Sequence, residues 1–291
     1  MLTLPGRGGG GVGVLDFGPI DRAVDLVFLH ATGFNARTYS LILEPLAQDY
    51  RVLALDQRGH GAATLAANPE NRADWQDYRD DLLAVGEVLN LEDVVLSGHS
   101  MGATVCLLAA GQAPGLARRL ILFDPVILPT PFVASGGPFV LAAGAERRRA
   151  VYDSRAQAFA SYRGRGAFAG WPDAMLRDYV EAGFRDLPSG GVALSCAPAW
   201  EASTYRAQRH DSRAAFDRSA CPIDLFKAEH NSATRFDPTT ETPNAAARID
   251  LRVVPDAGHF LPMQYPDLAR KALVAAIEGR ILSADDADLR R

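Results

Sequence analysis

Residues 94–103 read Val94-Val95-Leu96-Ser97-Gly98-His99-Ser100-Met101-Gly102-Ala103, and this stretch decides the fold. An apolar run leads into Gly-x-Ser-x-Gly, and small, helix-forming residues follow as far as Ala110. The order predicts a strand, a sharp turn with Ser100 at its apex, and a helix. Such a turn brings two backbone segments close together, so it needs the small residues Gly98 and Gly102. The helix after Ser100 points its N-terminal amides at the same place.

The rest of the chain alternates apolar runs with segments of helical periodicity. Besides the strand before Ser100, strands are predicted at residues 12–17, 24–29, 51–55, 120–123, 223–228 and 251–254. Helices are predicted at residues 36–48, 72–89 and 268–278. Strands that alternate with helices favour an α/β fold with a doubly wound, mostly parallel sheet.

One region, residues 126–220, interrupts this alternation. It has helix-like segments but no convincing buried strand, and aromatic and arginine side chains gather at residues 162–171. We interpret it as a helical cap inserted between two strands, which leaves residues 1–125 and 221–291 as the core. The alternative is a second packed lobe without a role in ligand binding. We favour the cap because ligands of open α/β sheets bind at the carboxyl ends of strands, where this insertion begins.

Composition narrows the class of protein. The chain has 291 residues, 48% hydrophobic and 22% charged, which suits one large α/β domain with or without an insertion. The net charge of −5 and the short basic run at residues 147–149, interpreted as a solvated helix face, argue against nucleic acid. Three widely spaced cysteines argue against a disulfide framework and a zinc site. No leader or membrane-spanning run is evident, so a cytoplasmic location is expected.

Four motifs resemble those of α/β-hydrolases with a cap domain. They are His30-Ala31-Thr32-Gly33-Phe34, Asp56-Gln57-Arg58-Gly59-His60-Gly61, Gly98-His99-Ser100-Met101-Gly102 and Asp256-Ala257-Gly258-His259-Phe260. The resemblance covers nearly the whole chain and implies the α/β-hydrolase fold with Ser100 as nucleophile. Esterases, C–C bond hydrolases and related acyl-transfer enzymes share these motifs, which are therefore far less specific for a substrate.

The resemblance also implies an oxyanion hole. Residues 30–34 resemble the loop that donates one backbone amide to the negatively charged oxygen of an acyl-transfer transition state. We assign the two amides to Met101, which follows the nucleophile, and to Thr32, with Phe34 as the alternative to Thr32. Substrate contacts are assigned to Phe34 and, in the cap, to Phe168 and Trp171.

The base and the acid differ in how clearly the sequence marks them. His259 matches the family's base, which takes the proton of Ser100 and later returns it to the leaving group. Relatives usually carry the acid where this chain has Asn231, and an amide cannot supply the negative charge that an imidazolium needs. Two carboxylates remain: Asp124, which ends the strand after the elbow helix, and Glu229, beside Asn231. We favour Asp124, although it could instead cap the chain's exit into the insertion.

Taken together, the motifs favour a serine hydrolase that cleaves a small-to-medium carboxylic ester through an acyl-enzyme. C–C bond hydrolysis of a diketone-like substrate by the same residues is an alternative. A different class is a ligand receptor that keeps the fold without catalysis. The expected partner is a small ester-like molecule, and neither a cofactor, a metal, nucleic acid nor a membrane is expected. The sequence is compatible with a homo-oligomer.

Overall fold

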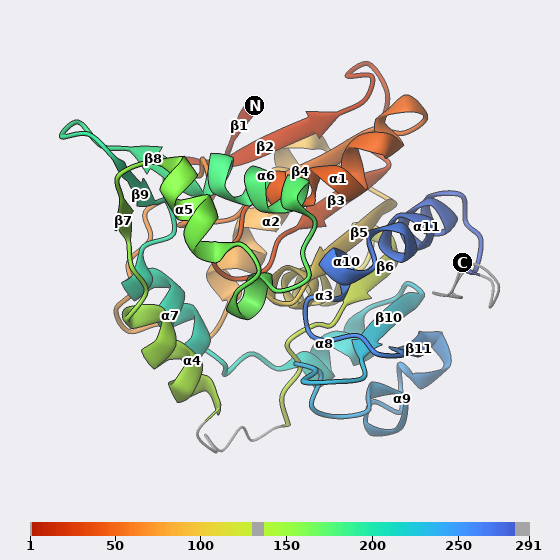
Figure 1. Cartoon of the computed structure of the whole chain (residues 1–291). Helices are drawn as coiled ribbons and strands as arrows, with labels where there is room; N and C mark the ends of the chain where they lie inside the picture. Colours follow the sequence, from red (N-terminus) through yellow and green to blue (C-terminus); the bar gives the residue numbers. More distant parts are fainter. Residues whose placement is uncertain (1, 130–136, 283–291) are drawn as a thin grey trace.

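The computed structural model describes residues 2–129 and 137–282, and its centre is an eight-stranded sheet (Figure 1). The strand order is β1-β2-β4-β3-β5-β6-β10-β11. The strands span Leu2–Pro5 (β1), Gly11–Phe17 (β2), Leu26–Leu29 (β3), Val52–Asp56 (β4), Val94–His99 (β5), Ala117–Phe123 (β6), Ile223–Ala228 (β10) and Ile249–Val254 (β11). Pairing is antiparallel between β1, β2 and β4 and parallel from β4 to β11. The predicted mostly parallel sheet is confirmed.

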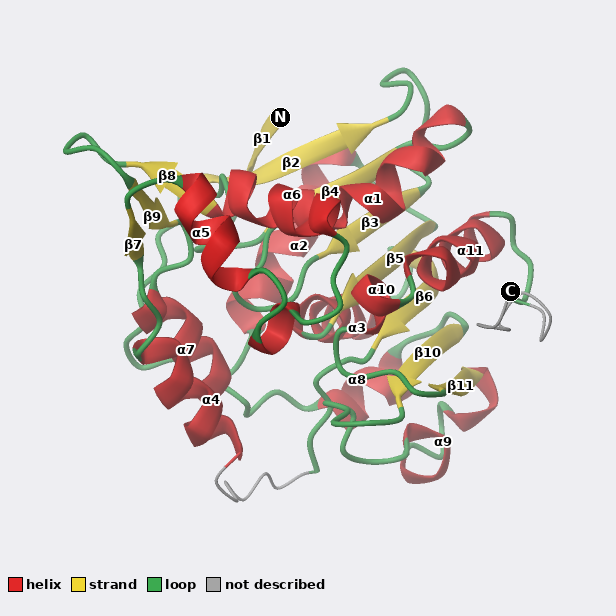
Figure 2. Cartoon of the chain, in the orientation of Figure 1, coloured by secondary structure: helices red, strands yellow, loops and turns green. Residues whose placement is uncertain are grey.

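Helices cover both faces of this sheet (Figure 2). One face carries α2 (Gln76–Leu89), α3 (Met101–Gln112) and α8 (Ser212–Arg218), and the other carries α1 (Ser40–Leu43) and α11 (Pro266–Ile277). Alternate residues of a strand point to opposite faces, so Val27 and Leu29 pack in one hydrophobic cluster while Leu26 and Phe28 pack in the other. A strand covered on both faces must be apolar throughout, which explains the unbroken runs in the sequence.

Short helical segments occupy the connections. They are η1 (Ala36–Tyr39), η2 (Glu44–Gln48), α9 (Pro238–Glu241), η4 (Ala246–Arg248) and α10 (Leu261–Gln264). The first of these begins at Asn35, whose side chain accepts a hydrogen bond from the amide of Thr38 and so caps it. Within the described part of the chain, no helix combines the length and hydropathy that a membrane span requires.

The segment between β6 and β10 adds no strand to the eight-stranded sheet (Figure 1). Its elements are α4 (Gly137–Glu146), β7 (Val151–Tyr152), α5 (Arg155–Tyr162), η3 (Gly166–Phe168), α6 (Asp173–Gly183), β8 (Phe184–Asp186), β9 (Val192–Leu194), α7 (Pro198–Arg206) and α8. Its residues 130–136 lie outside the described part. Three short strands form an antiparallel sheet in the order β7-β9-β8. The sequence predicted only helices for this insertion, and that part of the prediction is wrong. Strands of two or three residues are too short to show an alternating pattern in the sequence.

The last helix of the insertion, α8, differs from the rest. Its Ala215 packs against Gly111 of α3, where a methyl group on the glycine would lie 2.9 Å from the Ala215 carbonyl oxygen. Phe216 belongs to the same buried cluster as α3. This helix therefore belongs with the layer that covers the sheet, and the part of the insertion outside that layer ends with α7. The division into core and cap remains a proposal.

Candidate active site

Ser100 lies at the apex of a sharp turn between β5 and α3. Its φ of 55° and ψ of −118° are unusual for a residue with a side chain. A methyl group on Gly98 would lie 2.5 Å from the carbonyl carbon of Gly102, and one on Gly102 would lie 2.2 Å from the carbonyl oxygen of Leu29. Both positions therefore require glycine. The strand-turn-helix geometry predicted from the sequence holds the Ser100 hydroxyl beside the first turn of α3.

The imidazole of His259 lies between the side chains of Ser100 and Asp124. Its Nε2 is 3.0 Å from Oγ of Ser100, and its Nδ1 is 2.6 Å from Oδ2 of Asp124. A carboxylate can only accept, so Nδ1 carries the proton and Nε2 presents its lone pair to the serine hydroxyl. The structure thus brings together three side chains that the sequence had assigned to one reaction.

The Asp124 carboxylate is fully buried and surrounded by donors. Besides His259, it accepts hydrogen bonds from the amides of Ala228 and Ala233 and from the hydroxyl of Ser232. Burial alone would raise its pKa, but the hydrogen bonds, led by that from His259, outweigh this and hold the pKa below the ordinary value. The carboxyl group therefore stays ionised. Its backbone is in the left-handed region at φ 43°, a conformation that costs free energy and that the surrounding donors stabilise.

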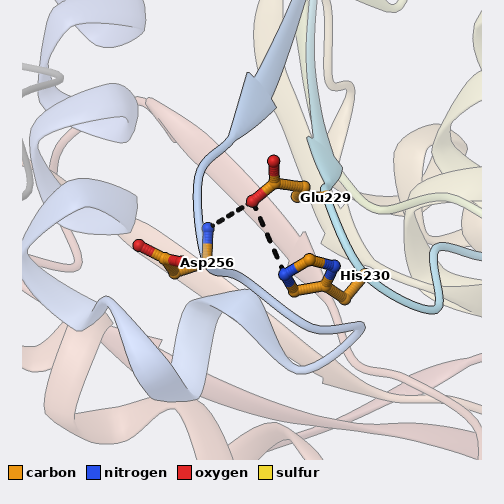
Figure 3. Close-up of side chains that lie close together, drawn as sticks. All are labelled: Glu229, His230 and Asp256. Atoms are coloured by element: carbon orange, nitrogen blue, oxygen red, sulfur yellow. Dashed lines mark hydrogen bonds and ion pairs between the residues drawn. The ribbon is translucent and has the colours of Figure 1, made fainter.

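Glu229, the alternative acid, contacts Asp256 and His230. Its Oε2 accepts a hydrogen bond from the amide of Asp256 at 2.8 Å and lies 3.6 Å from Nε2 of His230 (Figure 3). The side chains of Glu229, His230 and Asp256 are exposed, and their potential ligand atoms lie within 4.8 Å of one another. Exposed acidic groups commonly gather in this way, and we assign no cation to them. Asn231 is also exposed.

Within residues 31–34 of the loop after β3, one amide is available for an oxyanion. The other three are engaged: Ala31 N–H donates to the hydroxyl of Tyr39, Gly33 N–H to Nε2 of His60, and Phe34 N–H to the carbonyl of Ala31. The amide of Thr32 has no acceptor among the described residues. The amide of Met101 lies in the first turn of α3, where amides lack an acceptor within the helix. These contacts support Thr32 over Phe34, and the assignment remains a proposal.

Two buried histidines shape this loop. Nε2 of His30 accepts a hydrogen bond from the amide of Gln57, and Nε2 of His60 accepts one from Gly33. Burial lowers the pKa of His60 to about 4 and that of His30 well below its ordinary value. Both rings therefore stay neutral and can act as acceptors near neutral pH. His60 thus accepts the hydrogen bond that fixes the amide of Gly33 in this loop.

Aromatic side chains surround Phe34. Its ring centroid lies 5.2 Å from that of Trp171, 6.5 Å from Phe168, 5.5 Å from Tyr179 and 5.8 Å from Phe260. The three predicted substrate-binding residues thus come together beside the loop after β3, each less than a tenth exposed. Sequence reasoning missed Tyr179 and Phe260, although Phe260 directly follows His259. The indole Nε1 of Trp171 is buried and has no partner among the described residues.

A partly buried ion pair lies against the same loop. Arg148 donates to Oε2 of Glu201 at 2.5 Å and to the hydroxyl of Tyr179 at 2.7 Å. A methyl group on Gly33 would lie 2.8 Å from Glu201 and 3.2 Å from Arg148. The sequence interpretation of residues 147–149 as a solvated helix face is therefore wrong for Arg148. It lies beyond the end of α4 and turns inward.

Comparison with known proteins agrees with this geometry. Residues 26–272 match the model of the alpha/beta hydrolase family. The chain belongs to this family. It is therefore a hydrolase with the α/β-hydrolase fold, as the resemblance implied. It is 25% identical over 253 residues to the 2-(acetamidomethylene)succinate hydrolase of Mesorhizobium japonicum, with 87% of each chain covered. It is also 34% identical to the (E)-2-((N-methylformamido)methylene)succinate hydrolase of Acinetobacter baylyi over 35% of this chain and 37% of that protein.

Two solved structures show the same fold. The crystal structure of E-2-(acetamidomethylene)succinate hydrolase superposes with a TM-score of 0.77 at 22% identity, covering 93% of this chain and 96% of that one. A thermophilic esterase from Thermogutta terrifontis, with malate bound, superposes with a TM-score of 0.65 at 20% identity, covering 95% and 96%. At these identities the likeness concerns the fold and does not identify a substrate.

Proposed function

We propose that this hydrolase cleaves a small-to-medium carboxylic ester through an acyl-enzyme. Ser100 is the nucleophile, His259 the base and then the acid, and Asp124 the group that orients His259. The observation that carries the proposal is the unbroken hydrogen-bonded chain from Ser100 Oγ through His259 to Asp124. The segment from α4 to α7 acts as the cap, since its Phe168 and Trp171 contact Phe34 beside the oxyanion loop.

Each step of the reaction uses a group already in place. Ser100 Oγ attacks the ester carbonyl carbon while Nε2 of His259 takes the hydroxyl proton. The amides of Thr32 and Met101 stabilise the negative oxygen of the tetrahedral intermediate. The intermediate collapses, His259 gives its proton to the leaving alkoxide, and the acyl group stays on Ser100. Water then attacks the acyl carbon by the same route in reverse, which releases the acid and restores the serine.

A fluorophosphonate probe and a chromogenic ester test the proposal. The wild-type enzyme should be labelled at Ser100 and should release a burst of chromophore, whereas a receptor without catalysis should show no burst. Ser100→Ala should lose labelling and turnover. Ser97→Ala is the matched control, because it removes a buried hydroxyl of β5, three residues before Ser100, that donates to the Ile121 carbonyl. Labelling that persists in Ser100→Ala would refute the nucleophile assignment.

A more specific candidate is a substrate that carries a second, free carboxylate. Two relatives are named as hydrolases of succinate derivatives. In this chain Arg148 offers a guanidinium next to Gly33, and its side chain keeps a 20% exposed fraction among otherwise buried neighbours. A guanidinium has five N–H donors, so a substrate carboxylate can share it with Glu201.

Paired esters separate this candidate from a simple esterase. The 4-nitrophenyl ester of succinic acid carries a free carboxylate, and that of butyric acid does not. We expect kcat/KM to favour the succinate ester in the wild-type enzyme, and Arg148→Gln to remove that preference. Arg147→Gln, an exposed neighbour, is the matched control and should leave the preference unchanged. Equal kcat/KM for both esters in the wild-type enzyme would contradict the candidate without affecting the serine mechanism.

A further inference from the structure

His99, the residue just before the nucleophile, contacts both of the loops that meet at Ser100. Its Nε2 lies 2.8 Å from the backbone carbonyl oxygen of His259, and its Nδ1 lies 2.8 Å from the hydroxyl of Tyr39. The hydroxyl of Tyr39 in turn accepts a hydrogen bond from the amide of Ala31 at 3.2 Å. The side chains of His99 and Tyr39 are fully buried.

The donor and acceptor chemistry of these groups determines which atom carries the proton in each of these hydrogen bonds. A carbonyl oxygen can only accept, so Nε2 of His99 carries the proton of the neutral ring. Its Nδ1 then has a lone pair and accepts from the Tyr39 hydroxyl. That leaves a lone pair on the Tyr39 oxygen for the amide of Ala31. The hydrogen bonds therefore run in one direction, from Ala31 through Tyr39 and His99 to His259, and all four groups are satisfied.

The imidazole of His99 must stay neutral for this arrangement. Burial, together with the nearby His259, lowers the pKa of His99 to about 3. The two ring centroids are 5.1 Å apart. When His259 takes the serine proton it becomes positively charged, and a second positive ring at that distance would oppose the step. The Tyr39 hydroxyl also keeps its proton, because burial raises its pKa well above the ordinary value.

We propose that Tyr39 and His99 are positioning residues that hold the base loop and the oxyanion loop in register around Ser100. Ala31 directly precedes Thr32, so a shift of the Ala31 amide also moves the proposed oxyanion donor. The carbonyl of His259 belongs to the base itself. The two loops follow β3 and β11, at separate places in the sheet, and this hydrogen-bonded chain links them across His99. The inference rests on the proposed serine mechanism.

The rate of fluorophosphonate labelling tests the inference without knowledge of the substrate. Tyr39→Phe keeps the ring and removes the hydroxyl. We expect the maximal labelling rate at Ser100 to fall about 10- to 100-fold, because a misplaced donor or base costs about that much. The probe's half-saturating concentration should change less than about threefold, since the binding surface is intact. Tyr78→Phe is the matched control: it removes another buried hydroxyl, bonded to Thr204, and should leave the labelling rate unchanged.

A second variant tests whether the residues act as one unit. His99→Gln keeps an amide N–H that can donate to the His259 carbonyl but removes the ring nitrogen Nδ1 that accepts from Tyr39. If Tyr39 and His99 act as a unit, the variant that carries both Tyr39→Phe and His99→Gln should be labelled no more than about threefold more slowly than the slower single variant. Melting temperatures are measured for all variants. A labelling rate for Tyr39→Phe equal to that of Tyr78→Phe, at comparable loss of melting temperature, would show a structural role alone. That result leaves the serine mechanism standing, whereas labelling of Ser100→Ala refutes the mechanism itself.

Discussion

Nδ1 of His259 lies 2.6 Å from the carboxylate of Asp124, although the two residues are 135 positions apart in the sequence. Asp124 follows β6, and His259 follows β11. The strand between them, β10, is followed by the loop where α/β-hydrolases usually carry the acid. Here that loop supplies donors instead, since Ser232 and Ala233 bind the Asp124 carboxylate. In the proposed triad the acid therefore follows β6 instead of β10, and the loop after β10 binds its carboxylate.

This arrangement predicts a large difference between two carboxylate variants. Asp124→Asn should lower turnover by about 10⁴-fold, because an amide favours the wrong tautomer of His259 and cannot stabilise the imidazolium. Glu229→Gln should change turnover by less than about threefold, since the exposed Glu229 side chain contacts Asp256 and His230. Steady-state kinetics with a chromogenic ester measure both. Loss of activity in Glu229→Gln with activity kept in Asp124→Asn would reverse the assignment.

The sequence predicted the parts of the site that follow from local pattern. The elbow at Ser100 has a strand before it and small residues around it, and the position of Asp124 follows because the carboxyl ends of parallel strands share one edge of the sheet. Contacts between distant segments left no such pattern. Nothing local marks Arg148 as the partner of Glu201, and His99 resembles any packed histidine until Tyr39 and the His259 carbonyl are seen on either side of it.

Trp171 is predicted to affect both stability and specificity, and two variants separate the effects. Trp171→Ala should destabilise the fold by about 3–5 kcal/mol, because the indole is buried among Phe34, Phe168 and Phe260. Trp171→Phe keeps most of the ring and removes Nε1, which has no partner among the described residues. Its unfolding free energy should therefore change little, while KM should rise for substrates that accept a hydrogen bond from Nε1. Urea unfolding and an ester panel measure the two effects. Unchanged KM across the panel would limit Trp171 to packing.

Gly33→Ala should disable the oxyanion loop. Gly33 has φ +77°, and a methyl group there would meet the Glu201 carboxylate at 2.8 Å. We expect the loop to shift and turnover to fall more than about tenfold, because the neighbouring Thr32 amide moves with it. Gly164→Ala is the matched control, since Gly164 has φ +70° with no atom near the added methyl group. The Gly164→Ala variant therefore introduces backbone strain without a steric clash, and it should keep its activity. Normal turnover in Gly33→Ala would contradict the proposed role of the loop.

Acidification should destabilise the protein well above the pH at which ordinary, exposed carboxylates titrate. Burial lowers the pKa of His60 and His210 to about 4 and that of His99 to about 3, and it also lowers that of His30. The unfolded chain binds protons on these groups near pH 6.5 and the folded chain does not, so stability is lost as the pH falls from about 6.5 towards 4.

Three carboxyl groups away from the surface modify this pH dependence, one in the same direction and two in the opposite direction. The lowered pKa of Asp124 adds a loss at acid pH, because the folded state stabilises its ionised form. Burial raises the pKa of Asp56 to about 6 and also raises that of Asp81, so the folded chain binds these protons first and gains stability on acidification. Two carboxyl groups that gain against four histidines that lose leave a net loss, at about 1.4 kcal/mol per pH unit for each net proton.

Urea unfolding at constant ionic strength between pH 8 and pH 5 measures this dependence. The unfolding free energy should be highest at pH 7–8 and should fall steeply below pH 6.5. His210→Phe keeps a ring to stack on Trp75, at 4.5 Å between centroids in the native pair, and removes one of the buried histidines. The unfolding free energy of this variant should depend less steeply on pH, by about the contribution of one proton. A free energy that is flat or rises from pH 7 to pH 5 would show that the histidines can take up protons without unfolding. The assignment of His30, His60 and His99 as neutral acceptors around Ser100 would then fail.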